Sequence, residues 1–126
     1  MMSNKIISGY RKKIRLLLNK IEHSSFSVAF TDPLVKGTPG KVYRKCGNPI
    51  CKCAKNIEDR HGPYLVVQIR KDGKSKQIAL RKNQRVIWQQ AKNYQKQMDT
   101  INVFKKYCLD LEKIMREIIK QRTKKF

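Results

Sequence analysis

The sequence has few acidic residues: 9 Asp and Glu stand against 30 Lys and Arg, which gives a formal net charge of +21 over 126 residues. A chain this positive repels itself unless a polyanion is present, and its field raises the rate at which it meets one. Nucleic acid is therefore the expected partner, and a membrane surface is the main competitor.

Long apolar runs are also missing. No stretch of 18 apolar residues occurs, so no membrane-spanning helix is expected. The first residues lack the apolar run and small-residue cleavage site of a secretory signal. We therefore expect a reducing, cytoplasmic environment, in which cysteines stay reduced or bind metal. Apolar residues still make up 40% of the chain, which is enough for a modest core.

The common motifs of nucleotide-binding enzymes and metalloproteases are absent. The sequence contains no Walker loop, no Gly-rich dinucleotide turn, no HExxH and no HxH. Asp32, Glu58 and Asp59 fit turns and loops better than a catalytic set. We therefore expect a protein that is not an enzyme.

Histidine is rare, but one of the two histidines follows a cluster of cysteines. Cys46, Cys51 and Cys53 lie within eight residues, and His61 comes eight positions later. In an extended segment Cys51 and Cys53 would project from the same side, and Gly47 could turn the chain so that Cys46 joins them. Such a Cys3His set suits tetrahedral zinc. The alternatives are unrelated thiols, a disulfide that leaves one thiol unpaired, and a structural role for the histidine.

Hydrophobic periodicity predicts a β region between two helices. Helical spacing favours an amphipathic helix over 4–22, and alternation is compatible with a short strand over 26–30. A strand is expected over 41–45. A hairpin is expected where Asp72-Gly73, a pair typical of primed turns, joins strands over 64–69 and 75–80.

Proline and glycine are absent after Asn83, so a second helix is expected over 83–122. The apolar positions of this helix recur with a mean spacing near 3.5, which is typical of coiled coils. They should pack on the N-terminal helix, on a second copy in a homodimer, or on another protein. The positions spaced by sevens are Ile87, Tyr94, Ile101, Cys108 and Met115.

These elements predict an α+β fold with a single domain over 1–126. The zinc-binding region 26–80 would hold a small antiparallel sheet, made of the hairpin and one or two more strands, with zinc at one end. The helices over 4–22 and 83–122 would flank it. A structural metal is a common means of stabilising a globule of this size.

Basic residues dominate the hairpin and the start of the second helix. Between Gly73 and Met98 there are seven Lys and Arg and no acid. A solvated face is the alternative interpretation, but so unbalanced a run favours contact with DNA phosphates. The candidate nucleic-acid-binding residues are Arg44, Lys45, Lys52, Arg70, Lys71, Lys74, Lys76, Arg81, Lys82 and Arg85.

A family resemblance rests on the residues around the cysteines. The segments Tyr43-Arg44-Lys45-Cys46-Gly47, Cys51-Lys52-Cys53-Ala54 and His61-Gly62-Pro63-Tyr64 form the pattern YRxCGxxxCxCA…HGPY. This pattern resembles that of a family of small, basic prokaryotic proteins with a helical C-terminal region. The length and charge are similar to those of TnpC-like accessory proteins encoded beside the tyrosine recombinases of transposons.

The resemblance implies a nucleoid-associated protein that assists a recombinase in transposition without exchanging strands itself. Double-stranded DNA and a recombinase would then be the partners, and zinc the cofactor. Two other interpretations remain open: a protein-interaction module whose charge serves solubility, and an RNA-binding zinc protein.

Overall fold

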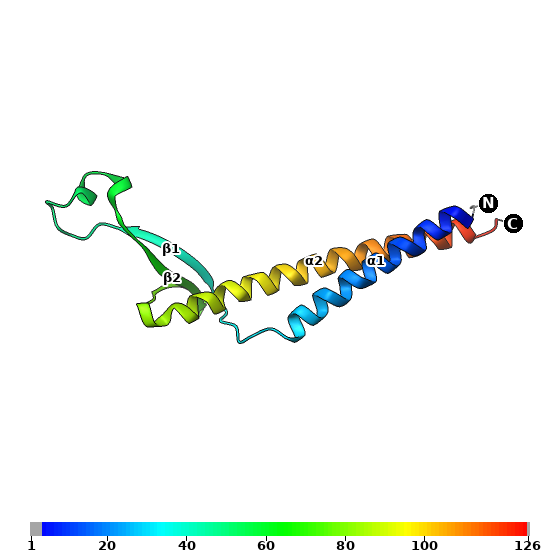
Figure 1. The fold of residues 1–126 in the computed structure, drawn as a ribbon, viewed down its shortest axis with the longest axis horizontal. Helices are drawn as coiled ribbons and strands as arrows, with labels where there is room; N and C mark the ends of the chain where they lie inside the picture. Colours follow the sequence, from blue (N-terminus) through cyan, green and yellow to red (C-terminus); the bar gives the residue numbers. More distant parts are fainter. Residues whose placement is uncertain (1–3, 126) are drawn as a thin grey trace. The chain divides into compact units, whose positions relative to one another are not determined.

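The computed structural model describes residues 4–125, which form two compact units. One unit combines the chain up to Thr31 with the chain from Gln97 onward, and the other is Asp32–Lys96. The element order is α1 (Asn4–Ala29), β1 (Thr38–Arg44), β2 (His61–Lys71), β3 (Lys74–Ala79) and α2 (Arg85–Arg122), with 3-10 turns η1 (Lys52–Ala54), η2 (Ile57–Asp59) and η3 (Lys82–Gln84). The predicted α+β architecture is confirmed (Figure 1).

The sheet of the second unit is antiparallel in the order β1-β2-β3. The predicted hairpin turn is present: Asp72 has φ +54° and Gly73 has φ +75°, and Lys71 lies opposite Lys74. Positive φ at both central residues is the requirement of a type I′ turn, which explains the Asp-Gly pair.

The central strand is buried on both faces near its middle. Val66 and Val67 are adjacent, so their side chains point to opposite faces, yet they are only 3% and 2% exposed. On the neighbouring elements, Ala91 at the start of α2 is fully buried. This small core fixes the sheet, one end of which carries the cysteine loop.

The first unit is a pair of antiparallel helices, formed by α1 and the later part of α2 (Figure 1). Apart from Ser27, the buried and half-buried side chains of α1 follow a spacing of three and four residues: Ile7, Tyr10, Ile14, Leu17, Ile21, Ser24 and Val28. The facing side chains of α2 recur in the same way and are called the inner stripe: Gln97, Thr100, Phe104, Tyr107, Leu111, Ile114 and Ile118.

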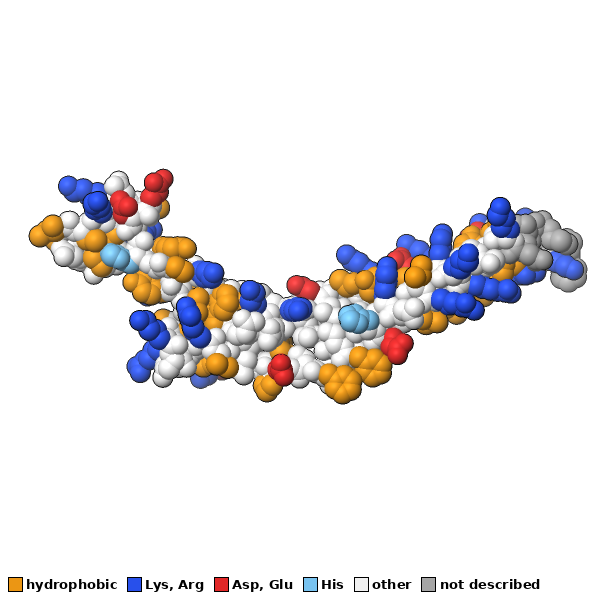
Figure 2. Space-filling model, viewed as in Figure 1, with side chains coloured by type: hydrophobic (Ala, Val, Ile, Leu, Met, Phe, Trp, Pro, Cys, Tyr) orange, Lys and Arg blue, Asp and Glu red, His pale blue; other side chains and the backbone are white. Residues whose placement is uncertain are grey.

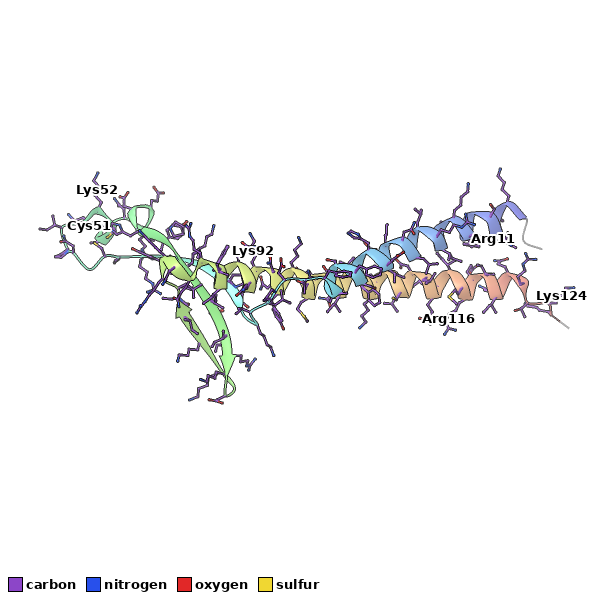
Figure 3. The ribbon with its side chains drawn as sticks, turned by 60° about the horizontal axis from the view of Figure 1, so that its bottom comes forward. Arg11, Cys51, Lys52, Lys92, Arg116 and Lys124 are labelled. Atoms are coloured by element: carbon purple, nitrogen blue, oxygen red, sulfur yellow. The ribbon has the colours of Figure 1, made fainter. Side chains whose placement is uncertain are left out.

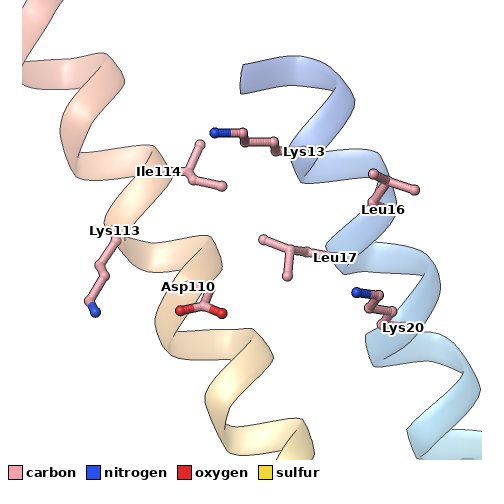
Figure 4. Close-up of a pocket in the computed structure, with 7 residues that line it drawn as sticks. All are labelled: Lys13, Leu16, Leu17, Lys20, Asp110, Lys113 and Ile114. Carbon is pink, nitrogen blue, oxygen red and sulfur yellow. The ribbon is translucent and has the colours of Figure 1, made fainter. Parts of the chain in front are cut away.

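Figure 4 shows the packing between these helices. Leu17 of α1 points towards Ile114 and Asp110 of α2, whereas Lys113 points away from α1. These residues line an open groove of about 400 Å³, which Lys13, Leu16 and Lys20 complete. Further along, the Lys20 ammonium lies 5.4 Å from the centre of the Tyr107 ring.

One expectation about the helices is wrong. The segment 26–30 is not a strand, because α1 continues to Ala29 and the Phe30 N–H donates to the Phe26 carbonyl at 3.0 Å. Over five residues, alternation cannot be distinguished from helical spacing. In the second helix, Ile101 and Met115 are 44% and 53% exposed. They lie beside the residues that pack on α1, because α2 carries two adjacent apolar stripes and α1 mainly covers the one that includes Phe104 and Leu111. Packing of the exposed stripe on a second copy or on another protein stays a prediction.

Candidate metal centre

The candidate metal ligands lie in the loop between β1 and β2 and at the first residue of β2, at the end of the sheet away from the Asp72-Gly73 turn. β1 ends at Arg44, which pairs with His61, the first residue of β2. This pairing brings Cys46 and His61 to the same end of the sheet. Figure 3 shows Cys51 and Lys52 in this loop, beyond the strands.

Polar turns fold the loop. Gly47 has φ +85°, a conformation that suits glycine. The Asn48 side-chain Oδ1 accepts the Ile50 N–H at 3.0 Å, and the Asn48 backbone carbonyl accepts the Cys51 N–H at 3.1 Å. Asn48 was missed by sequence reasoning, although a Gly-Asn-Pro run is a typical turn signal.

The expected extended path from Cys51 to Cys53 is wrong. Residues Lys52–Ala54 form a 3-10 turn, and the Ala54 N–H donates to the Cys51 carbonyl at 3.0 Å. In this turn the backbone N–H groups of Ala54 and Lys55 donate to the carbonyls of Cys51 and Lys52. An extended segment would not provide these hydrogen bonds. The cysteines nevertheless meet, because the turn points Cys53 inwards, where it is 1% exposed.

The four predicted ligand side chains converge. The ligand atoms of Cys46, Cys51, Cys53 and His61 all lie within 4.8 Å of one another, so the group could hold a metal ion. The Sγ atoms of Cys46 and Cys53 are 3.5 Å apart, and the Cys51 Sγ lies 3.3 Å from His61 Nε2. All four cysteines of the chain are free thiols, so the disulfide alternative has no counterpart in the structure.

These separations match a tetrahedral site. With metal–sulfur bonds of about 2.3 Å, tetrahedral geometry places two sulfurs about 3.8 Å apart. The Cys46–Cys53 sulfur separation of 3.5 Å is close to this value, so the side chains need little movement to bind an ion. The Cys46 N–H also points at the Cys53 Sγ, at 3.4 Å, as is favourable for a thiolate.

The thiols differ in acidity. The backbone N–H of Cys53, followed by His61 and the two other thiols, lowers the pKa of Cys51 to about 6. The backbone N–H of Cys46 lowers the pKa of Cys53, but burial and the neighbouring thiols outweigh it and raise that pKa above its usual value. The lowered pKa favours the thiolate form of Cys51, which is the form that binds metal.

The ten predicted nucleic-acid-binding side chains are all exposed, but the sheet divides them. Lys71 lies opposite Lys74, and Ile69 lies opposite Lys76, so Lys71, Lys74 and Lys76 share one face. We call them the tip lysines. Arg70, adjacent to Lys71, points to the other face.

The remaining candidates lie elsewhere in the unit. Arg44, Lys45 and Lys52 are beside the metal centre, at the opposite end of β2 from the tip lysines, and Arg81, Lys82 and Arg85 lead into α2. Within residues 4–125, no ion pair joins any of the ten to an acidic side chain. Figure 2 shows Lys and Arg side chains spread over both units, with few acidic ones between them.

Comparison with known proteins identifies one family. The family model described as a domain of unknown function, DUF6788, matches residues 8–91, which include all four candidate metal ligands. Neither a curated protein nor a solved structure matches the chain. Of the helices in residues 4–125, none has the length and apolarity needed to cross a membrane.

Proposed function

Given that the chain belongs to the DUF6788 family, a domain of unknown function, we propose that it is a non-enzymatic, zinc-stabilised module that binds double-stranded DNA. The observation that carries the DNA part is the group of tip lysines, three exposed cations on one face of a hairpin without ion-pair partners.

Zinc is the metal that the donor set favours. Three thiolates and one imidazole at tetrahedral separations match the ligands of structural zinc sites. Harder ions such as magnesium and calcium prefer oxygen ligands. With four protein ligands no position is left for a reactive water, which favours a structural role over catalysis.

Elemental analysis of protein purified without chelators tests the metal proposal. We expect one zinc per chain, and cobalt substitution should give the absorption bands of a tetrahedral thiolate site. Iron in place of zinc, or no metal near stoichiometry, would contradict the proposal.

Charge distribution supports DNA as the partner. From Gly73 to Met98 no acidic residue interrupts the basic ones, so the field of this segment is not cancelled locally. Phosphate contacts of this kind give affinity with little sequence preference. Lys71 and Lys74 flank the two-residue turn, and Lys76 follows in β3, so the tip lysines lie near the free end of the hairpin, where a DNA groove can approach them.

A matched pair of triple variants tests the DNA proposal. Reversal of the tip lysines (Lys71→Glu, Lys74→Glu, Lys76→Glu) should weaken binding to duplex DNA of any sequence. The control carries the same change of net charge on exposed residues of the other unit: Lys106→Glu, Lys120→Glu and Lys124→Glu. Fluorescence anisotropy with labelled duplex should show a large loss for the first variant and a small one for the second. Equal losses of DNA affinity in the two variants would mean that the reversals act through net charge and not through contacts of the tip lysines.

The role of accessory to a transposon recombinase is also part of the proposal, and its support is the similarity of the chain's length and charge to those of TnpC-like accessory proteins. Gene neighbourhood tests it most directly: a flanking recombinase gene supports the accessory role, whereas ribosomal genes favour RNA as the ligand. If the tip-lysine reversal leaves DNA affinity intact while substitutions in the distal part of α2 abolish association with a recombinase, the protein-interaction module is the better description.

A further inference from the structure

The helix α2 has a second apolar stripe that α1 does not cover. It lies about a quarter turn round the helix from the inner stripe, given 3.6 residues per turn. Met98, Ile101 and Leu109 are 43%, 44% and 48% exposed, and Met115 and Ile119 are 53% and 65% exposed. With Lys105, Cys108 and Glu112 between them, these residues form what we call the outer stripe.

Most of the outer stripe is turned away from α1, whereas Ile101, at its edge, lines a groove with Ser24, Ser25 and Val28 of α1. Figure 3 shows Arg116, which borders it and pairs with Glu112 at 2.9 Å, on the side of α2 turned away from α1. Large apolar side chains repeating over six helical turns are unusual on a surface that meets only water. A helix with two apolar stripes packs on two neighbours, and α1 is one of them.

The order of residues in the outer stripe is self-complementary. When the stripe is laid antiparallel on a copy of itself with Cys108 near the two-fold axis, Lys105 meets Glu112 of the second copy. In the same register Met98 meets Ile119, and Ile101 meets Met115. An isologous interface requires this kind of match, in which each contact occurs twice.

A parallel dimer with the two stripes in register would not be complementary in this way. It would place Lys105 against Lys105 and Glu112 against Glu112, and like charges at an interface are unfavourable. The sequence of the stripe therefore distinguishes between the two orientations.

Local charge also favours a second copy. The chain as a whole is strongly positive, but the segment from Asp99 to Glu117 holds four acidic and four basic side chains. This part of α2 can therefore approach its own copy without the repulsion that the rest of the chain would cause.

We propose that the protein is an antiparallel homodimer through the outer stripe of α2, with Lys105–Glu112 pairs on either side of a two-fold axis near Cys108. This interface requires neither the metal nor DNA, so it stands or falls independently of the proposed function.

Exchange of the paired charges tests the register. In sedimentation of the full, metal-loaded chain, the wild type should be a dimer. Lys105→Glu alone and Glu112→Lys alone should each raise the dissociation constant about tenfold, because two attractive pairs become repulsive. The double variant Lys105→Glu/Glu112→Lys should restore the wild-type value. The exposed Arg116 pair lost with Glu112 contributes little.

Two further measurements separate loss of association from loss of folding. Met115→Asp should abolish the dimer while leaving helix content by circular dichroism unchanged, since Met115 does not pack on α1. A short bismaleimide should link two wild-type chains but not two Cys108→Ser chains. A monomeric wild type, a double variant that stays dissociated, or a Met115→Asp dimer would each overturn the proposal.

Discussion

Trp88 at the start of α2 donates its indole N–H to the carbonyl of Gly40 in β1, across 3.1 Å and 48 residues of sequence. The ammonium groups of Lys41 and Lys92 lie 5.7 and 5.4 Å from the centre of the same ring. One side chain therefore joins the helix to the sheet by a hydrogen bond and by packing between two cations.

Replacement of Trp88 by Phe should cost about 1 kcal/mol of unfolding free energy, because the Gly40 carbonyl loses its donor while the ring keeps most of its packing. Chemical unfolding followed by circular dichroism measures this cost. Trp88 is the one tryptophan of the chain, so its fluorescence in the wild type reports on this unit. An unchanged midpoint would mean that water replaces the indole at no cost.

Gly62 should not tolerate a side chain. It has φ +142°, and a Cβ there would lie 2.7 Å from the Val42 carbonyl oxygen. Gly62→Ala should cost about 1–3 kcal/mol and displace the neighbouring His61, so the metal should be lost to a chelator sooner. The control is Gly9→Ala in α1, where nothing lies within 4 Å; that change should stabilise the helix by about 0.5–1 kcal/mol. Thermal unfolding of both variants checks the contrast.

Single substitutions should distinguish the four candidate metal ligands from Cys108, the cysteine outside the cluster. The substitutions Cys46→Ser, Cys51→Ser, Cys53→Ser and His61→Ala should each lower the amount of metal bound per chain. Cys108→Ser should leave that amount unchanged. Since metal-binding energy is folding energy, metal removal should expose the amides of the loop over 45–60 to hydrogen exchange. The antiparallel helices should stay protected. Metal loss in Cys108→Ser would show that the site has been assigned to the wrong thiols.

The helix pair offers a test of which apolar stripe α1 covers. Leu111→Asp places a charge on the inner stripe and should cost about 2–4 kcal/mol, with a loss of helix content. Leu109→Asp makes the same kind of change on the outer stripe, at a residue that is 48% exposed, and should leave helix content unchanged. Circular dichroism distinguishes the two. If both variants lose helix equally, α1 contacts both stripes.

The sequence predicted the elements that local rules determine. The type I′ turn at Asp72-Gly73 and the uninterrupted helix after Asn83 follow from backbone preferences, and the Cys3His group follows from ligand chemistry. Which stripe of α2 is covered depends on α1, far away in the sequence. Spacing by sevens fits Ile101 and Met115 as well as Phe104 and Leu111, so periodicity alone could not choose between them.

The sequence also could not predict on which face of the hairpin each basic side chain lies. A list of basic residues along a hairpin treats Arg70 and Lys71 alike, but the pleat sends them to opposite faces. The register between paired strands determines which side chains share a face. That register is known only once the partner strands are known. The register shows that three of the ten cations, Lys71, Lys74 and Lys76, share one face near the hairpin turn.

The salt dependence of DNA binding should count these contacts. If about six side chains neutralise phosphates, log K should fall against log salt with a slope near −5, at about 0.9 per contact. Reversal of the three tip lysines should make the slope shallower by about 2.7, because each lost contact releases one ion fewer. The Lys106, Lys120 and Lys124 reversals should lower affinity at low salt through long-range repulsion but leave the slope near −5. Titrations at several salt concentrations decide the point, and a slope unchanged by the tip-lysine reversal would place the phosphate contacts elsewhere on the protein.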